Sequence, residues 1–245
     1  MLNLIRKISR SQDFSPGILG IILNPFYIAR SELAHGIKSY SAYMNGRLLD
    51  IGCGIKPYEN YFSVDSYVGL EIDSVQSRLI AQADKYYSGI NFPFEDNSFE
   101  CAICNQVLEH VFNPDQFLLE INRVLSHEGV LLLTVPFIWD EHEQPYDYAR
   151  YTSFGLSHLA QKNGFRVIHQ KKLGGNTSAI FQLINAYLFK VTLKQPIILK
   201  CIIKGLLIPL INIIGVLSKF IFPSNPDFYL DNIILLIKKN ESLQK

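Results

Sequence analysis

The chain has 245 residues and 48% of them are hydrophobic, so it can bury the core of one large domain, with or without an appendage. A formal net charge of +1 gives no electrostatic basis for binding nucleic acid. Four cysteines in apolar settings are too few for a disulfide scaffold, which favours a cytoplasmic location.

The amino-terminal segment places basic residues before the apolar run GILGIIL (17–23). This order imitates a signal peptide, but Asn24 and Pro25 interrupt the run early and no small-residue cleavage pattern follows. We therefore expect residues 1–46 to form an N-terminal helical leader packed on the domain.

The middle of the chain alternates between strand-like and helix-like segments. The predicted strands are RLLDIGC (47–53), YVGLEI (67–72), LIAQADKY (79–86), FECAICNQ (99–106) and GVLLLTVPF (129–137). Such alternation predicts an α/β fold with a doubly wound, mostly parallel sheet, whose ligand site lies beyond the carboxyl ends of the strands. Asp50, Glu71, Asn105 and Pro136 fall at these ends.

The clearest helix is NPDQFLLEINRVLSHEG (113–129), with an apolar stripe at helical spacing. Asn113 is expected to cap it, Pro114 suits its first turn and Gln116 completes a capping-box pattern. Gly129 is expected to end it. Cys101 and Cys104 form a CxxC pair, but on a strand they point to opposite faces, so no redox or zinc role is expected.

The turn after the first strand contains Asp50, Gly52 and Gly54, and Pro57 stands where a dinucleotide site would have a third glycine. A carboxylate before the glycines suits an ammonium group better than a diphosphate. Glu71, at the end of the next strand, can accept hydrogen bonds from both hydroxyls of a ribose. A ribose with a cationic amino-acid tail and no phosphate describes S-adenosylmethionine.

With these residues the chain resembles the class I S-adenosylmethionine-dependent methyltransferases. LLDIGCG matches their first motif and YVGLEID their ribose-binding strand end. INFPFEDNSFECAICNQVLEHV matches the adenine-side loop and fourth strand, and FLLEINRVLSHEGVLLLTVPF the helix and fifth strand that follow. The resemblance covers residues 47–137, and it implies a seven-stranded Rossmann-like sheet and S-adenosyl-L-methionine as cofactor.

The resemblance also assigns roles to single residues. It implies that Asp50, Gly52 and Gly54 line the methionine part of the cofactor and that Glu71 binds its ribose. Two further cofactor-binding candidates are Asp84, for the adenine side, and Asn105. In place of the acid that family members often have nearer the adenine loop, this chain has Ser88 and Gly89.

A methyl group on a sulfonium is already activated, so the protein mainly supplies positioning and exclusion of water. A hydroxyl acceptor must also lose a proton, which a histidine can take. PFIWDEHEQPYDYARYT (136–152) is therefore predicted as an acceptor-side lid, with His142 as the first candidate for the base and Arg150 beside the acceptor. His110 is the second candidate, and it can instead lock the turn beside the cofactor.

The lid segment has two other interpretations. It can be a salt-bridged surface loop, or Glu141, His142, Glu143 and Asp147 can bind a metal ion. Because adjacent loop residues make poor ligand spacing, no metal site is predicted. The pattern P-F-x-W-x-E-H-E-x-P-x-D-Y-x-R-Y-T resembles a subgroup of methyltransferases among bacterial surface-polysaccharide enzymes, which favours the acceptor-side interpretation.

Beyond the lid we predict a helix at 153–165, a strand at 165–173 and a final strand within 227–239. The core is then 47–173, with 227–245 as its last strand and tail, and 174–226 is an apolar helical insertion. A buried helix pair, a dimer interface or a bilayer surface would each explain its apolar surface. Its longest uncharged piece, 205–218, is shorter than the roughly 18 residues of a membrane span.

The sequence thus predicts an O-methyltransferase for a glycan or glycolipid intermediate, with no nucleic-acid partner. The alternatives are a methyltransferase for a quinone or other small lipid and a non-catalytic cofactor-binding scaffold. The expected location is the cytoplasm, and peripheral contact with the inner face of the membrane and homodimerisation through 174–226 both stay open.

Overall fold

The computed structural model of the protein describes residues 12–240. The chain forms two compact units, one made of Met1–Gly36 and Lys172–Asp231 and the other of Ile37–Lys171 and Asn232–Lys245. The first eleven residues of the expected leader lie outside the described part. Of the remainder of the leader, residues 12–36 belong to the first unit and residues 37–46 to the second.

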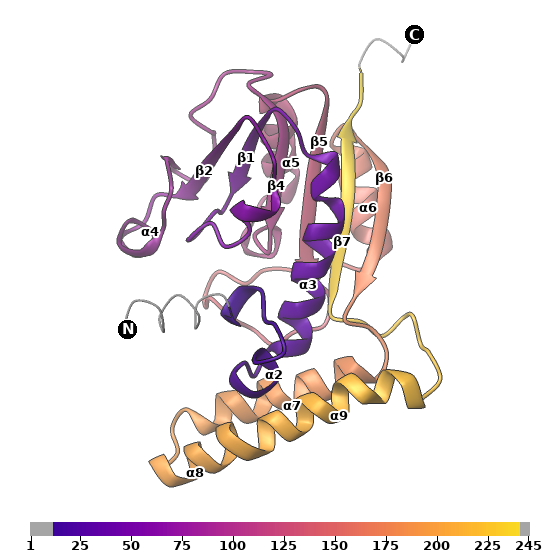
Figure 1. Cartoon of the computed structure of the whole chain (residues 1–245). Coiled ribbons are helices and arrows are strands. Elements are labelled where there is room, and N and C mark those ends of the chain that lie inside the picture. Colours follow the sequence, from indigo (N-terminus) through magenta and orange to yellow (C-terminus); the bar gives the residue numbers. More distant parts are fainter. Residues whose placement is uncertain (1–11, 241–245) are drawn as a thin grey trace. The chain divides into compact units, whose positions relative to one another are not determined.

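The second unit is built on a seven-stranded sheet of order β3-β2-β1-β4-β5-β7-β6 (Figure 1). The strands are β1 (Arg47–Ile51), β2 (Ser66–Ile72), β3 (Lys85–Tyr87), β4 (Phe99–Asn105), β5 (Leu125–Pro136), β6 (Phe165–Leu173) and β7 (Asp231–Lys238). The pairs β1 with β2, β1 with β4, β2 with β3 and β4 with β5 are parallel. The predicted mostly parallel, seven-stranded sheet is confirmed.

The sheet is the core of this unit. Its helices are α4 (Val75–Ile80), α5 (Pro114–Val124) and α6 (Ser153–Lys162), with short 3-10 turns at η1 (Ser41–Tyr43), η2 (Glu59–Tyr61) and η3 (Leu108–His110). Leu49 of β1, Ala102 of β4 and Leu131 of β5 are fully buried in one apolar cluster. Continuous apolar runs suit these central strands because helices cover a parallel sheet on both faces.

The boundaries of two predicted elements are wrong. Helix α5 ends at Val124, and Gly129 lies inside β5, where Leu125 pairs with Phe99 of β4. The side chain of Asn113 makes no capping bond, so the predicted capping box is absent from α5. Pairing with a neighbouring strand has overridden the helical periodicity of residues 125–129.

The segment 79–86, predicted as a strand, is also divided differently. Leu79 and Ile80 end α4, whose first turn is held by a capping box between Ser74 and Ser77, and only Lys85–Tyr87 form β3. Leu79 is 80% exposed, so its apolar character reflects no buried strand. The strand predicted at 165–173 has the observed bounds of β6, and the final strand lies within the predicted 227–239.

The first unit is helical, as predicted for 174–226. Its elements are α2 (Gly20–Leu23), α7 (Thr177–Thr192), α8 (Ile197–Ile202), the π-helical turn η4 (Ile203–Leu207) and α9 (Ile208–Ile221), while α3 (Tyr27–Tyr40) begins in this unit and ends in the other. Residues 197–221 form one helix of 25 residues that is long and apolar enough to cross a membrane, judged by length and composition. The segment was expected to be too short to span a membrane because that expectation counted only its uncharged centre, residues 205–218.

Candidate active site

The turn after β1 brings the backbone close to the loop after β4. Gly52 and Gly54 have φ angles of +70° and +48°, a conformation that favours glycine. A Cβ atom on Gly52 would lie 2.3 Å from Cγ2 of Val107, whereas one on Gly54 would meet nothing within 4 Å. Packing therefore requires Gly52, while the open space at Gly54 lets a ligand approach the backbone.

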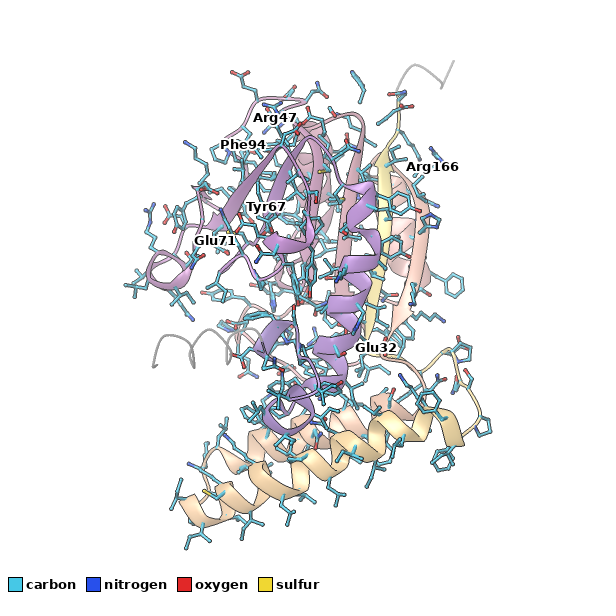
Figure 2. The ribbon with its side chains drawn as sticks, in the orientation of Figure 1. Glu32, Arg47, Tyr67, Glu71, Phe94 and Arg166 are labelled. Atoms are coloured by element: carbon cyan, nitrogen blue, oxygen red, sulfur yellow. The ribbon has the colours of Figure 1, made fainter. Side chains whose placement is uncertain are left out.

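Two carboxylates beside this turn, Asp50 on β1 and Glu71 on β2, differ in their surroundings. Asp50 is 5% exposed, and its Oδ2 accepts a hydrogen bond of 2.6 Å from the Tyr67 hydroxyl. Burial raises the pKa of Asp50 to about 7, although the bond from Tyr67 opposes the rise. Glu71 accepts the N–H groups of Gly54 and Ile72 at 2.9 and 3.0 Å, and Figure 2 shows Tyr67 and Glu71 on the same strand.

The other two cofactor candidates are held by protein groups. Asp84 precedes β3 and accepts hydrogen bonds from the Gly69 N–H and the Lys56 ammonium at 2.7 and 2.6 Å. It therefore lies on the amino side of β3, and Ser88, which follows the strand, lies at the carboxyl end. Asn105 ends β4, where its Oδ1 accepts the Thr134 hydroxyl at 2.8 Å. These two bonds hold Asp84 between Gly69 of β2 and Lys56 of the loop after β1, and its role at the adenine side stays a prediction.

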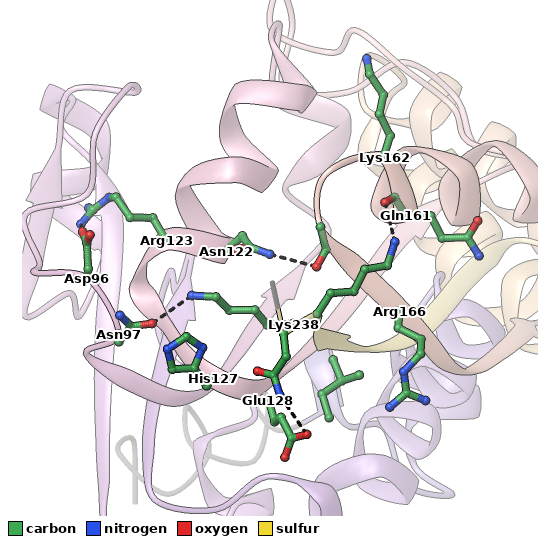
Figure 3. Close-up of a pocket in the computed structure, with 14 residues that line it drawn as sticks. Asp96, Asn97, Asn122, Arg123, His127, Glu128, Gln161, Lys162, Arg166 and Lys238 are labelled. Carbon is green, nitrogen blue, oxygen red and sulfur yellow. Dashed lines mark hydrogen bonds and ion pairs between the residues drawn. The ribbon is translucent and has the colours of Figure 1, made fainter. Parts of the chain in front are cut away.

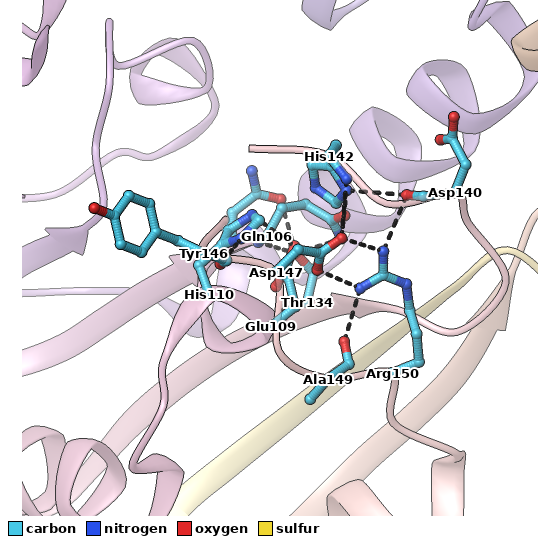
Figure 4. A network of polar contacts seen from close by, with 11 residues as sticks. Gln106, Glu109, His110, Thr134, Asp140, His142, Tyr146, Asp147, Ala149 and Arg150 are labelled. Carbon is cyan, nitrogen blue, oxygen red and sulfur yellow. Dashed lines mark hydrogen bonds and ion pairs between the residues drawn. The ribbon is translucent and has the colours of Figure 1, made fainter. Parts of the chain in front are cut away.

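The lid after β5 is organised around Asp147 (Figure 4). Its carboxylate accepts two hydrogen bonds from Arg150, at 2.6 and 2.7 Å, and one from the backbone N–H of His142 at 3.0 Å. Mainly because of the bonds from Arg150, the pKa of Asp147 falls to about 2. Arg150 also donates to the carbonyl of Asp140 at 3.0 Å, so it acts inside the lid as a support for Asp147.

The lid is attached to η3, which follows β4. The backbone N–H of Tyr148 donates to the carbonyl of Glu109 at 2.8 Å, and Nδ1 of His110 lies 2.8 Å from the carbonyl of Tyr146. A carbonyl only accepts, so Nδ1 of His110 carries the hydrogen. Burial lowers the pKa of His110 and favours its neutral form.

His142 has the geometry of an oriented base. Its Nδ1 lies 3.2 Å from the carbonyl of Asp140 and 3.3 Å from Oδ2 of Asp147, two acceptors that place the ring hydrogen on Nδ1. The other nitrogen, Nε2, keeps a lone pair that can take a proton. The rings of His110 and His142 meet edge to face with centroids 4.8 Å apart, so the structure brings both predicted bases together.

One group of side chains has metal-ligating atoms. Those of Glu109, His110 and His142 lie within 4.8 Å of one another, and Glu109 is fully buried. This set differs from the one weighed in the sequence, since only His142 is common to both. Nε2 of His110 lies 3.8 Å from Oε1 of Glu109, so these three groups could hold a metal ion, although both histidines also make the lid contacts described above.

A cavity of about 710 Å³ lies elsewhere in this unit, at the amino ends of β4, β5 and β6 (Figure 3). Several of its polar side chains bind other protein groups. Arg123 pairs with Asp96 at 2.6 Å, and Lys238 donates to Asn97 at 3.0 Å. Internal pairing explains these charges without a ligand, and the cavity lies at the opposite strand ends from the glycine turn.

Comparison with known proteins identifies the family. The sequence profile described as "Methyltransferase domain" matches residues 27–170, which include the glycine turn, Glu71 and the lid. The chain belongs to this methyltransferase family. It is a class I member, whose cofactor is S-adenosylmethionine.

Curated relatives resemble the methyltransferase over about half of its length. An uncharacterised protein of Methanocaldococcus jannaschii is 31% identical over 127 residues, which is 51% of this chain and 56% of the relative. A protein of Rickettsia bellii named ubiquinone biosynthesis O-methyltransferase is 26% identical over 146 residues, which is 54% of this chain and 60% of the relative.

Solved structures share the fold of the methyltransferase. A putative sarcosine dimethylglycine methyltransferase from Galdieria sulphuraria has a TM-score of 0.53 and 19% identity, covering 84% of each chain. Phosphoethanolamine N-methyltransferase 2 of Haemonchus contortus, in complex with S-adenosyl-L-methionine, has a TM-score of 0.54 and 17% identity, covering 91% of this chain and 56% of that one.

The described residues fit S-adenosylmethionine. Asp50 offers a buried carboxylate for the ammonium group, Glu71 retains lone pairs for the ribose hydroxyls, and Gly54 leaves open space. Sequence reasoning missed Tyr67 as the partner of Asp50 and Asp147 as the support of His142. Asp147 stood among the acids of the lid, but only the folded loop shows which acid faces the histidine.

Proposed function

We propose that the methyltransferase transfers the methyl group of S-adenosylmethionine to a hydroxyl of a glycan or glycolipid intermediate. The observation that carries this proposal is the orientation of His142, whose Nδ1 faces Asp140 and Asp147 so that Nε2 can accept a proton. An amine acceptor presents its own lone pair, whereas a hydroxyl gains from a base that takes its proton. The polar, aromatic lid supports a sugar as the hydroxyl-bearing group.

The residues act at defined atoms. When bound, S-adenosylmethionine would supply an activated methyl group for the acceptor oxygen. Asp50 and Glu71 would hold the two ends of this cofactor, and Nε2 of His142 would take the hydroxyl proton. Asp147, with a pKa of about 2, is ionised throughout the neutral range and stabilises the resulting imidazolium. Arg150 positions Asp147, and His110 locks the lid through Tyr146.

A quinone precursor is the second candidate acceptor. It is favoured by the relative from Rickettsia bellii, whose name gives ubiquinone biosynthesis, and it also presents a hydroxyl. The proposed location for either acceptor is the cytoplasm, supported by the free thiols of Cys53, Cys101, Cys104 and Cys201.

The test supplies methyl-labelled S-adenosylmethionine and the purified protein to a cell extract and to isolated membranes. We expect label in a glycan or glycolipid fraction, released as an O-methyl sugar after acid hydrolysis. Label in a quinone fraction would replace the first candidate by the second. If neither fraction takes up label although the protein binds the cofactor, the interpretation as a non-catalytic cofactor-binding scaffold would be favoured.

A further inference from the structure

The helices of the first unit are polar where they meet and apolar outside. Asn185 on α7 and Asn212 on α9 are fully buried, and Nδ2 of Asn185 donates to Oδ1 of Asn212 at 2.8 Å. Asn212 in turn donates to the carbonyls of Ile21 and Asn24 at 2.9 and 3.0 Å. Amide and carbonyl groups therefore hold this unit together, in a position that apolar side chains occupy in most water-soluble helix pairs.

Many apolar side chains of these helices lie on the outside, where they form continuous exposed stripes. On the helix 197–221 the exposed residues recur every three or four positions, which places them on one helical face. This face includes Leu199, Ile202, Leu206, Leu210, Ile213, Leu217 and Phe220, from 40% to 77% exposed, and Ile197, Ile198, Leu207, Ile214 and Ile221 are exposed as well. A second stripe on α7 consists of Ile180, Ile184, Tyr187 and Val191. α7 and α9 pack along each other (Figure 1), and so many exposed apolar side chains mark an interaction surface.

The charges around these stripes are of one sign. Residues 174–226 contain no aspartate or glutamate, but they include Lys190, Lys194, Lys200, Lys204 and Lys219. Among the described acids of this unit, Glu32 lies 4.0 Å from Lys219 and Asp227 pairs with Lys172. Lysines 190, 194, 200 and 204 cluster where α7 ends and α8 begins.

We propose that the apolar face of α7–α9, the membrane-binding face, lies in the surface of an anionic lipid bilayer. Apolar side chains enter the boundary between headgroups and acyl chains, and the lysines meet lipid phosphates. Charge favours lipid over a second copy of the chain as the occupant, because residues 174–226 of another copy offer no carboxylate to these lysines, whereas an anionic bilayer offers phosphates. This inference holds for either proposed acceptor.

Charge also decides against a spanning hairpin. Four lysines at the turn between α7 and α8 would have to cross the hydrocarbon core, and charged side chains oppose such a transfer. The long helix 197–221 has the length and composition of a span, but Lys200 and Lys204 lie within it and would have to enter or approach the hydrocarbon core. We therefore place the helices in the plane of the membrane surface.

The experiment is flotation of the purified full-length protein with phosphatidylcholine vesicles, with and without phosphatidylglycerol, at low and high salt. We expect binding that requires the anionic lipid and is reversed by salt. The double variant Lys200→Glu and Lys204→Glu is expected to weaken binding at least about tenfold, since each lysine near an anionic surface contributes about fivefold. Lys85→Glu with Lys171→Glu, on the second unit, is the matched control and should bind like the wild type.

A second pair of variants tests the apolar contact. Leu210→Gln with Leu217→Gln should abolish vesicle binding and preserve affinity for S-adenosylhomocysteine, which reports an intact second unit. The control, Leu119→Gln with Phe154→Gln, changes two exposed apolar residues of the second unit and should still bind. Wild-type protein that stays unbound with anionic vesicles at low salt would overturn the proposal. So would a lipid-independent dimer that the Leu210/Leu217 variant converts to a monomer.

Discussion

At the scale of single residues, the site contains two aspartates in opposite states. Asp50 is buried beside a neutral hydroxyl donor, and its pKa rises to about 7. Asp147 faces the guanidinium of Arg150, and its pKa falls to about 2. Because the two side chains are chemically identical, their surroundings alone account for the difference between their pKa values. Asp50 can therefore ionise when a cation binds beside it, whereas Asp147 is already ionised before any ligand binds.

The first prediction concerns Asp50. A bound ammonium group favours the ionised carboxylate, so cofactor binding must release the proton that the free protein holds below pH about 7. Affinity for S-adenosylhomocysteine is therefore expected to be complete above this pH and to weaken about tenfold for each pH unit below it. Asp50→Asn should lower affinity roughly tenfold to a hundredfold and flatten the dependence. Calorimetric titration across the neutral range measures both effects, and a wild-type affinity that does not change with pH contradicts the assignment.

The same change should have the opposite effect on stability. The raised pKa means that the free folded protein binds more protons than the unfolded chain between pH about 4 and about 7, so ionising Asp50 costs stability as the pH rises through this window. Asp50→Asn removes this cost and should raise the melting temperature of the cofactor-free protein at pH about 8. A lower melting temperature would mean that Asn cannot replace the bond to Tyr67.

The second prediction concerns His142. His142→Ala should leave cofactor affinity unchanged and lower kcat about 100-fold or more, because Nε2 of His142 takes the hydroxyl proton in the proposed reaction. Asp147→Asn removes the charge behind the imidazole and should lower kcat by about tenfold. His127→Ala, in the cavity at the opposite strand ends, is the control and should retain wild-type kcat. Steady-state kinetics with the identified acceptor provides the test. Near-normal turnover in His142→Ala would mean that the lid segment is a salt-bridged surface loop without a catalytic role.

The third prediction concerns metal ions. We expect dialysis against a chelator to leave turnover unchanged, because the proposed reaction needs the free lone pair of His142, which a bound metal ion would occupy. The nearby guanidinium of Arg150 interacts with Glu109 and also opposes a cation. Loss of turnover that returns with added zinc or manganese would reassign both histidines as ligands.

At the scale of elements, local patterns located most of the strands, but they did not locate the helix ends and they assigned the end of α4 to a strand. β6 has the predicted bounds because its residues form one uninterrupted strand-like run. The ends of α5 and α4 differ because a residue such as Leu125 can continue a helical stripe or pair with β4. Pairing decides between these alternatives, and it depends on residues far away in the sequence.

The fourth prediction concerns the glycine turn. Gly52→Ala should destabilise the protein through the left-handed backbone, at about 1 to 2 kcal/mol, and through contact with Val107, at about 1 to 3 kcal/mol. Gly54→Ala should carry only the backbone cost, since its Cβ meets nothing within 4 Å. Urea unfolding compares the variants. Val107→Ala is expected to restore part of the stability of Gly52→Ala, and no restoration would contradict the packing argument.

At the scale of the whole molecule, the chain divides its tasks between the two units. The glycine turn, Glu71 and the lid belong to the second unit, and the apolar stripes belong to the first. The first unit depends on Asn185 and Asn212, whose buried amides leave the apolar side chains outside. The two units should therefore respond separately to substitution.

The fifth prediction tests this separation. Asn212→Ala leaves Asn185 and two backbone carbonyls without their partner, at a cost of about 1 to 3 kcal/mol for each unsatisfied group. Proteolysis within 174–226 should become faster, while affinity for S-adenosylhomocysteine stays at the wild-type value. Ile213→Ala, at an exposed position on the same helix, should change neither property. A parallel loss of cofactor affinity would show that the units are not independent.

The sequence by itself determined the family, the order of the strands along the chain and the carboxylates of the cofactor turn. These features depend on short-range spacing, and the glycines and acids lie within a few residues of a strand. Only the tertiary structure decided that Tyr67 pairs with Asp50, that Asp147 rather than a neighbouring acid supports His142, and that Asn212 faces inward while Leu210 and Ile213 face outward. Each of these choices depends on which distant group meets the side chain, and spacing along the chain does not specify that partner.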